Sequence, residues 1–134
     1  MTSATTEMET RFERGLRNLA AIDGHAGEAV VTALDDIAPD FARYLVEFAF
    51  GDIYARPGLG VRDREIATIA ALTALGSAGP QLRVHIEAGL EVGLSRAEIV
   101  EVLMQMAVYA GFPAALNGLF VAKEVFAAHD AASP

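Results

Sequence analysis

Apolar residues recur at intervals of three and four along almost the whole sequence, and no stretch shows the strict alternation of a half-buried strand. Residues that favour helices, chiefly Ala, Leu, Glu and Arg, dominate the same stretches. Glycine and proline interrupt the pattern where short connections between helices would fall. The sequence therefore predicts an all-α domain, with helices expected over residues 9–22, 28–36, 39–54, 61–75, 81–92, 96–109 and 114–127.

Specific residues mark the helix starts in the second half of the chain. Pro80 suits the first turn of a helix, and it follows a short glycine-containing break, so we expect residues 61–75 and 81–92 to form a helical hairpin. The stretch Ser95-Arg96-Ala97-Glu98 has the pattern of a capping box. The helix that it opens is apolar almost all round, which is typical of a central or interfacial helix.

The length of 134 residues suits one hydrophobic core, because a second would leave both halves marginal. We expect a single domain over residues 9–127, with frayed termini at 1–8 and 128–134. Residues of the apolar classes make up 53% of the chain and charged residues only 21%, more apolar surface than a monomer of this size needs to bury. This surplus predicts a homo-oligomer.

Charge and composition argue against several partners. The net charge is −8 with no lysine or arginine cluster, so we expect neither nucleic acid nor an anionic membrane surface to bind. The first residues lack the pattern of a secretory signal, and no apolar run is long enough to span a bilayer, so a cytoplasmic protein is expected. The chain has no cysteine, which excludes thiolate catalysis, disulfides and cysteine-ligated metals.

His85 is the strongest candidate for acid–base chemistry among the three histidines. It lies between apolar residues in the second helix of the expected hairpin, whereas His25 and His129 fall in a glycine-rich stretch and in the C-terminal tail. The hairpin directs Glu65 towards His85, and a carboxylate that orients an imidazole suits general acid–base catalysis. The alternatives are a core histidine without a chemical role and a glutamate that offsets a helix dipole.

Arginine supplies nine of the ten basic side chains. Its planar fork grips carboxylates, so Arg62, Arg64 and Arg83 are candidates for holding a small organic acid near His85. Tyr109 offers a hydroxyl at the edge of an apolar surface and is a further candidate for substrate binding. Solvated helix arginines that pair with nearby acids are an equally good interpretation of the three arginines, and most tyrosines in such a position are packing residues.

Motifs for cofactors and metals are missing from the sequence. There is no His-x-x-x-His or His-Glu-x-x-His spacing and no carboxylate-rich loop, so we expect no metal. The stretch Gly76-Ser77-Ala78-Gly79 lacks the lysine and the preceding strand of a phosphate-binding loop, so we expect no nucleotide cofactor.

Five motifs in order give the sequence a family resemblance. They are Gly51-Asp52-Ile53-Tyr54-Ala55-Arg56-Pro57-Gly58-Leu59, Arg64-Glu65-Ile66, His85-Ile86-Glu87-Ala88-Gly89-Leu90, Glu98-Ile99-Val100-Glu101-Val102-Leu103 and Val108-Tyr109-Ala110-Gly111-Phe112-Pro113-Ala114-Ala115. Over roughly residues 11 to 126 the chain resembles the carboxymuconolactone decarboxylase family, within the alkyl hydroperoxidase D-like superfamily. The resemblance implies an all-α subunit in a ring, commonly a hexamer, with active sites near subunit contacts.

The resemblance also separates this chain from the thiol peroxidases of the superfamily. Those proteins use a Cys-x-x-Cys-x-x-x-His element, and the cysteine positions counted back from His85 are Ala78 and Gln81 here. Peroxidase activity by that mechanism is therefore excluded. The decarboxylase branch instead acts without a cofactor in the β-ketoadipate route of aromatic catabolism, and converts 4-carboxymuconolactone into an enol-lactone and carbon dioxide.

By this resemblance, His85 becomes the proton donor or oxyanion partner and Glu65 its orienting carboxylate. Arg64, with Arg62 or Arg83, becomes the anchor for the substrate carboxylate. Members close to the catabolic enzyme have Glu-Leu and Asn-Gly where this chain has Gln81-Leu82 and Val92-Gly93. Two alternatives therefore stay open: a lyase or isomerase of another lactone or β-keto acid in a biosynthetic pathway, and a non-catalytic ring-forming or ligand-binding protein.

Overall fold

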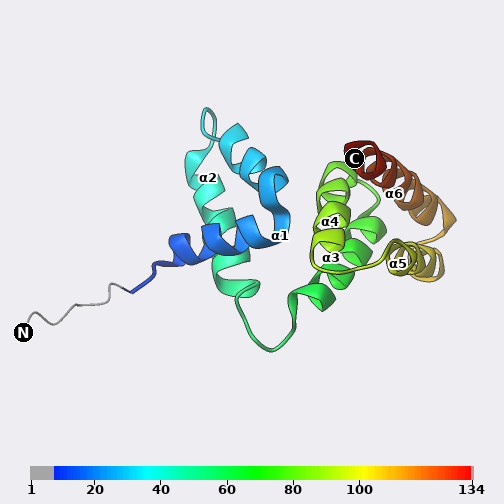
Figure 1. Cartoon of the computed structure of the whole chain (residues 1–134), viewed down its shortest axis with the longest axis horizontal. Helices are drawn as coiled ribbons and strands as arrows, with labels where there is room; N and C mark the ends of the chain where they lie inside the picture. The colour runs from blue at the N-terminus through cyan, green and yellow to red at the C-terminus, as the bar shows by residue number, and fades with distance from the viewer. Residues whose placement is uncertain (1–7, 134) are drawn as a thin grey trace, which may run out of the picture.

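The computed structural model describes residues 8–133, and all of its regular structure in that range is helical (Figure 1). The all-α prediction is confirmed. In chain order the elements are α1 (Arg11–Ala33), α2 (Pro39–Tyr44), the π-helix η1 (Leu45–Ile53), α3 (Val61–Leu75), α4 (Gly79–Glu91), α5 (Arg96–Tyr109) and α6 (Phe112–Ala132).

Helices α3 to α6 pack around the larger of two hydrophobic cores. Its buried residues are Ile69, Leu82, Ile86, Leu94, Ile99, Leu103, Ala122 and Val125. The predicted hairpin of α3 and α4 is present, and Pro80 lies in the first turn of α4. The capping box is present too: the Ser95 hydroxyl accepts from the Glu98 backbone N–H at 3.0 Å, and the Glu98 carboxylate accepts from the Ser95 N–H at 3.0 Å.

Helices α1 and η1 form the second core with one residue of α4. Its buried residues are Leu19, Ile22, Val46, Phe50 and Ala88. The two helix backbones approach so closely that a Cβ at Gly15 would lie 2.2 Å from the Val46 carbonyl oxygen. Side chains of α1 also satisfy carbonyls near the end of η1, since Arg14 Nε donates to Gly51 O at 2.6 Å and Asn18 Nδ2 donates to Phe50 O at 2.8 Å.

The two expected N-terminal helices are one broken helix in the structure. Gly24 has φ 54° and ψ −135°, a conformation that L-residues rarely adopt, and helical structure continues on both sides of it. The prediction of a loop over residues 23–27 was therefore wrong: a single glycine makes the turn, and the following residues remain helical to Ala33.

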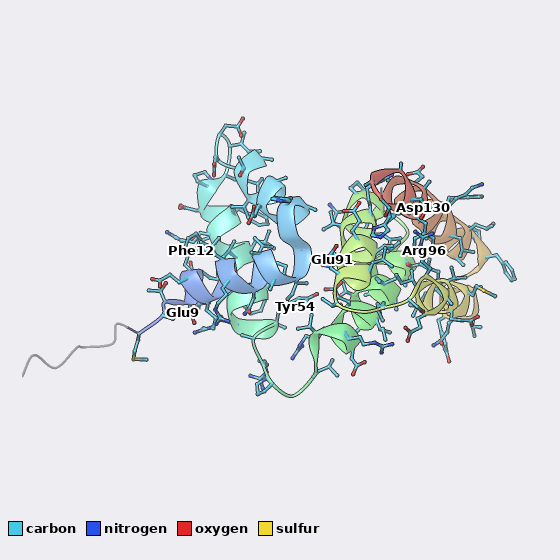
Figure 2. All side chains as sticks on the ribbon, viewed as in Figure 1. Glu9, Phe12, Tyr54, Glu91, Arg96 and Asp130 are labelled. Carbon is cyan, nitrogen blue, oxygen red and sulfur yellow. The ribbon has the colours of Figure 1, made fainter. Side chains whose placement is uncertain are left out.

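Helix α6 continues to Ala132, beyond the expected end at residue 127. An ion pair contacts this last turn and a half, because Arg96 at the start of α5 pairs with Asp130 (Figure 2). The same guanidinium lies 5.1 Å from the centre of the Phe126 ring, one turn earlier. The alanines between Phe126 and Asp130 also favour helix. The expected fraying of residues 1–7 and 134 falls outside the described residues.

Large apolar side chains remain exposed in two places on the chain. One group, on α2 and η1, includes Phe41 and Phe48, and the other lies where α5 meets α6, with Val108, Tyr109 and Phe112 all more than 70% exposed. Within residues 8–133, no helix has the length and apolar character that crossing a bilayer requires.

Candidate active site

Glu65 lies one turn into α3 and has no exposed surface. Its Oε2 is 3.0 Å from Nδ1 of His85, which projects from the facing helix α4 and is 17% exposed at the side chain. The hairpin of α3 and α4 therefore brings together the two residues that the sequence analysis paired. A buried carboxylate is costly unless it is hydrogen-bonded, and His85 supplies that bond for one of its oxygens.

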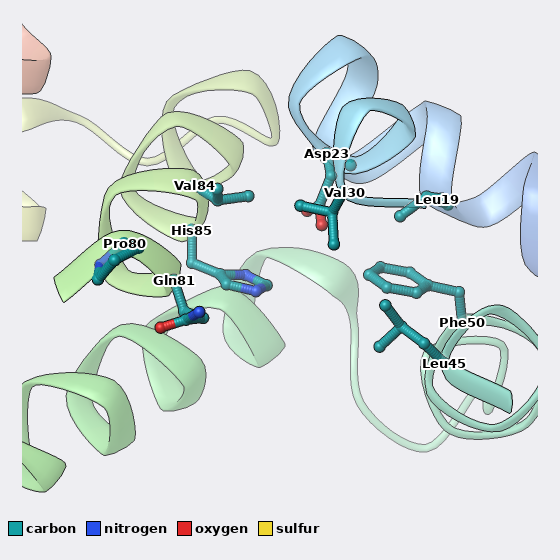
Figure 3. Close-up of a pocket in the computed structure, with 10 residues that line it drawn as sticks. Leu19, Asp23, Val30, Leu45, Phe50, Pro80, Gln81, Val84 and His85 are labelled. Atoms are coloured by element: carbon teal, nitrogen blue, oxygen red, sulfur yellow. The ribbon is translucent and has the colours of Figure 1, made fainter. Parts of the chain in front are cut away.

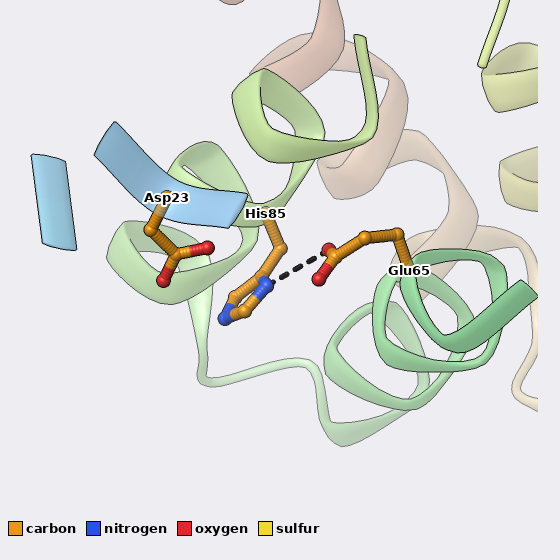
Figure 4. Close-up of side chains that lie close together, drawn as sticks. All are labelled: Asp23, Glu65 and His85. Atoms are coloured by element: carbon orange, nitrogen blue, oxygen red, sulfur yellow. Dashed lines mark hydrogen bonds and ion pairs between the residues drawn. The ribbon is translucent and has the colours of Figure 1, made fainter. Parts of the chain in front are cut away.

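The charge state of His85 reflects two opposing effects. Burial lowers the pKa of the imidazole, but the hydrogen bond and negative charge of Glu65, with a further contribution from Asp23, raise it, and the pKa of His85 lies above its ordinary value. Nδ1–H donates to Glu65 in this arrangement. The other ring nitrogen points away from Glu65 and is left to act on a ligand (Figure 4).

Asp23 is a third member of the site, and sequence reasoning missed it. It is the last residue of α1 before the break at Gly24, and it lies on the opposite side of the His85 ring from Glu65 (Figure 4). Burial, the largest effect, raises the pKa of Asp23 to about 6, while His85 lowers it and Glu65 raises it. The one signal for this residue in the sequence was its place between an apolar residue, Ile22, and a glycine, Gly24.

A cavity of about 240 Å³ opens between α1, η1 and α4 (Figure 3). Its walls are mostly apolar, and they bring together residues far apart in the chain: Leu19, Asp23, Gly27, Val30, Leu45, Phe50, Pro80, Gln81, Val84 and His85. Of these, Asp23 and His85 are titratable. A small apolar cavity with a few converging polar groups suits a small organic molecule, and its walls strengthen electrostatic interactions inside.

Tyr54, at the end of η1, packs against the cavity residue Phe50 and against α3. Its ring stacks on Phe50, a cavity residue, with centroids 5.0 Å apart, and its hydroxyl is 2.9 Å from Thr68 Oγ1. Burial raises the pKa of Tyr54 to about 12, with Thr68 lowering it and the nearby Glu65 raising it. The phenol therefore stays neutral at physiological pH. This tyrosine, rather than Tyr109, is the one near the His85 cluster.

The other predicted substrate-binding residues do not line the cavity of this chain. Arg62 pairs with Glu98, Arg83 pairs with Glu124, and Arg64 donates to the backbone carbonyls of Leu59 at 3.1 Å and Arg56 at 3.2 Å. Tyr109 is 78% exposed at the end of α5.

Helix geometry explains why these arginines lie elsewhere. Successive helical residues point about 100° apart, so Arg64, next to Glu65, and Arg83, two residues before His85, fall on other faces of their helices. Arg62, three residues before Glu65, lies nearer to its face, but its ion pair with Glu98 directs it towards α5.

Asp23, Glu65 and His85 are also the group that could hold a metal ion among residues 8–133, since one ligand atom from each lies within 4.8 Å of the others. Two carboxylates and an imidazole would suit a divalent cation such as Zn²⁺ or Mn²⁺. In the arrangement seen here, Nδ1 is already hydrogen-bonded to Glu65, which makes the cluster suited to holding and moving protons. The prediction of a metal-free site stays a prediction.

A helical chain with a buried carboxylate–imidazole pair beside a small cavity has an arrangement suited to acid–base chemistry, and comparison with known proteins identifies the family. The profile of the carboxymuconolactone decarboxylase family matches residues 39–124. The chain belongs to this family. The matched range includes Glu65 and His85 and begins after Asp23.

Three relatives extend the comparison. The chain is 34% identical to a 4-carboxymuconolactone decarboxylase of Acinetobacter baylyi over 120 residues, 88% of each protein. It is 34% identical to an uncharacterized 15.0 kDa protein of Paracoccus denitrificans over 73% of this chain and 74% of that one. It is 27% identical to a nitrosuccinic acid decarboxylase of Metarhizium robertsii over 84% of this chain and 79% of that one. Two of the three relatives are named decarboxylases, which supports carboxy-lyase chemistry in this chain.

Proposed function

We propose that this protein is a cofactor-independent carboxy-lyase that acts on a small carboxylated lactone, 4-carboxymuconolactone or a related acid. The observation that carries the proposal is the buried Glu65–His85 pair, whose imidazole lines a cavity of small-molecule size. The family of this chain includes named decarboxylases. The partial burial of His85 and its bond to Glu65 favour this function over a non-catalytic scaffold, in which the imidazole would have no need of an oriented partner.

The chemistry follows from where charge develops. When the substrate carboxylate leaves as carbon dioxide, the electron pair of the broken C–C bond moves through the ring C=C into the lactone carbonyl, and an oxyanion forms. His85 donates a hydrogen bond to this oxyanion from the nitrogen that faces away from Glu65. Glu65 holds the ring in place and stabilises its positive charge. The apolar walls exclude water and so strengthen this stabilisation.

The names of the relatives support a substrate class rather than one compound. In 4-carboxymuconolactone the departing electron pair reaches a lactone carbonyl through a double bond, and in nitrosuccinic acid it reaches a nitro group on the same carbon. Both reactions place the electron pair on oxygen, so both need an oxyanion partner and a source of one proton. His85 meets the first need in either case.

Arg62, Arg64 and Arg83 could anchor the substrate carboxylate only in the site of another subunit. Each is engaged within its own chain and lies outside the cavity, so it would have to act on a site of a neighbouring subunit in the predicted ring. Within one chain, Gln81 is the polar residue of the cavity that can receive a substrate carboxylate while His85 binds the oxyanion.

A direct assay tests the function. Loss of the ultraviolet absorption of 4-carboxymuconolactone and release of carbon dioxide are measured with EDTA present, alongside other small acids with a conjugated or geminal electron-withdrawing group. We expect turnover by the wild type and a fall of about 10²-fold or more in kcat for His85→Ala. His129→Ala, which alters an exposed histidine, is the matched control and should keep full activity.

Full turnover by His85→Ala would remove the proposed role of His85. Absence of turnover by the wild type on every acid at high enzyme concentration would remove the decarboxylase function and favour the ligand-binding alternative.

A further inference from the structure

We propose that Asp23 is the acid of this site that delivers a proton to the substrate carbon, while His85 holds the oxyanion. The inference rests on the proposed function and deepens it. It divides two tasks between two side chains on different walls of one cavity, one from α1 and one from α4.

The position of Asp23 fits contact with a ligand. It lines the cavity, and one of its carboxylate oxygens lies within 4.8 Å of ligand atoms of both His85 and Glu65. Figures 3 and 4 show its carboxyl group directed into the space beside the imidazole. Glu65 does not line the cavity, because it lies behind His85 and is fully buried. Asp23 is thus the carboxyl group that a bound ligand can touch.

Asp23 lacks the partners of a structural carboxylate. Elsewhere the aspartates on helix surfaces pair with arginine, as Asp52 does with Arg11 and Arg14, and as Asp130 does with Arg96. Within residues 8–133, by contrast, Asp23 Oδ1 is buried and meets no hydrogen-bond donor. A buried carboxylate oxygen without a partner costs stability, and ionisable groups in such surroundings are concentrated at functional sites. Its pKa of about 6 keeps a protonated fraction at near-neutral pH.

The reaction needs an acid at a place other than His85. After carbon dioxide leaves, the negative charge lies on the carbonyl oxygen, whereas the proton must reach the carbon beside that carbonyl. The Oδ–H bond of Asp23 breaks as the new C–H bond forms, using the enolate electron pair. The aspartate then takes one proton from water, so that each turnover consumes one carboxylate and one proton and yields carbon dioxide and the protonated product.

The break in α1 places Asp23 for this task. The non-helical backbone at Gly24 turns the chain directly after Asp23, and Gly27 and Val30 of the following segment line the same cavity. Asp23 also lies before residue 39, where the family match begins, so the acid comes from the N-terminal core and the Glu65–His85 pair from the matched part.

The test compares Asp23→Asn, Asp23→Glu and the control Asp36→Asn, which alters an exposed aspartate outside the cavity. On an acid that the wild type turns over, we expect Asp23→Asn to lower kcat about 10²-fold with a smaller change in KM. Asp23→Glu should recover part of the loss, because it restores a carboxylic acid, and Asp36→Asn should match the wild type.

The pH profile supplies a readout that a structural role would not move. The titratable groups that act most strongly on Asp23 are His85 on α4, Glu65 on α3 and Tyr54 at the end of η1. His25 on α1 and Glu87 and Glu91 on α4 line a neighbouring hollow that Asp23 shares. Since the protonated carboxyl is the active form, wild-type kcat/KM should fall as pH rises through about 6, and Asp23→Asn should lose this limb while keeping any limb due to His85 at higher pH. Circular dichroism and thermal unfolding verify that each variant folds.

The outcomes separate the two proposals. A wild type that turns over no acid overturns the proposed function and this role with it. An active wild type whose Asp23→Asn variant keeps its kcat and the limb near pH 6 overturns the role of Asp23 alone. A folded Asp23→Asn variant with the expected loss, partly restored by Asp23→Glu, supports it.

Discussion

Three side chains carry the proposed chemistry, and the environment of each depends on its neighbours. Glu65 is buried because His85 bonds it, and His85 keeps a raised pKa because Glu65 and Asp23 outweigh the effect of its own burial. Asp23 has its pKa raised to about 6 chiefly by burial. The shifts of Asp23 and His85 depend on each other, so the protonation of these two groups should be measured together.

This coupling predicts how stability depends on pH. The folded-state pKa values of both His85 and Asp23 are raised, so the stability that their protonation contributes is full below their unfolded-state values and is lost as pH rises through the folded ones. We therefore expect the free energy of unfolding, measured with urea, to decrease from about pH 5 towards pH 8. At lower pH the carboxylates with lowered pKa values, Asp52 and Asp130 among them, should reverse the trend.

Glu65→Gln tests the His85 part of this dependence. The variant should lower the His85 pKa, followed by NMR of the imidazole, and should lose about 1–3 kcal/mol of stability at pH 5.5, because the buried imidazolium loses its counter-charge. The loss should shrink as pH rises through the raised pKa of the wild-type imidazole, because the imidazole then no longer carries a charge that needs Glu65. Glu124→Gln, which breaks the exposed pair with Arg83, should change little at either pH. An unchanged His85 pKa in Glu65→Gln would contradict the coupling.

At the scale of elements, short-range sequence patterns predicted the features that depend on neighbouring residues. The capping box at Ser95, the proline at the start of α4 and the α3–α4 hairpin follow from short-range patterns, and the hairpin then places Glu65 opposite His85. Asp23 could not be found in this way, because its position depends on the packing of α1 against α4 across 62 residues of chain. The arginines were expected at the cavity because of their chemistry, but ion pairs with Glu98 and Glu124 direct two of them elsewhere.

The break in α1 gives a prediction at this scale. Gly24→Ala places a Cβ on a backbone with φ 54° and ψ −135°, and we expect a loss of about 1–3 kcal/mol in the free energy of unfolding, or a shift of the following segment. Either result should lower activity, since Asp23 and Val30 flank the break and line the cavity. Gly58→Ala, in an open turn without a positive φ, is the control and should be nearly neutral. An equally neutral Gly24→Ala would show that the break is not needed.

At the scale of the whole molecule, the exposed apolar groups bear on assembly. Met104 and Val108 on α5, and Phe112, Leu116 and Phe120 on α6, recur every four residues and are 47–76% exposed. A second group on α2 and η1 includes Phe41 and Phe48. Such surfaces are typical of subunit contacts, and they agree with the apolar surplus of the sequence.

Light scattering after gel filtration tests the predicted ring. We expect a mass that is a multiple of 14.1 kDa, and a smaller species for the pair of substitutions Val108→Ser and Phe112→Ser or for Phe48→Ser. If one substitution yields dimers and the other trimers, the two surfaces form different contacts. If the wild type has the mass of a single chain at micromolar concentration, the predicted assembly is wrong. Arg62, Arg64 and Arg83 would then have no neighbouring subunit whose site they could reach.

The cavity lies between the two hydrophobic cores, and each side contributes one titratable residue, Asp23 from α1 and His85 from α4. Substitutions on the wall formed by Leu19, Val30 and Leu45 can therefore reshape what the cavity accepts while the Glu65–His85 hairpin keeps its own packing. A graft of residues 8–53 from a relative would exchange α1, α2 and η1 together, and with them this wall and the proposed proton donor. Under the proposed roles, the residues that shape the cavity and the residue that binds the oxyanion belong to different parts of the chain. The N-terminal core is then the part to vary when acceptance of a new acid is sought.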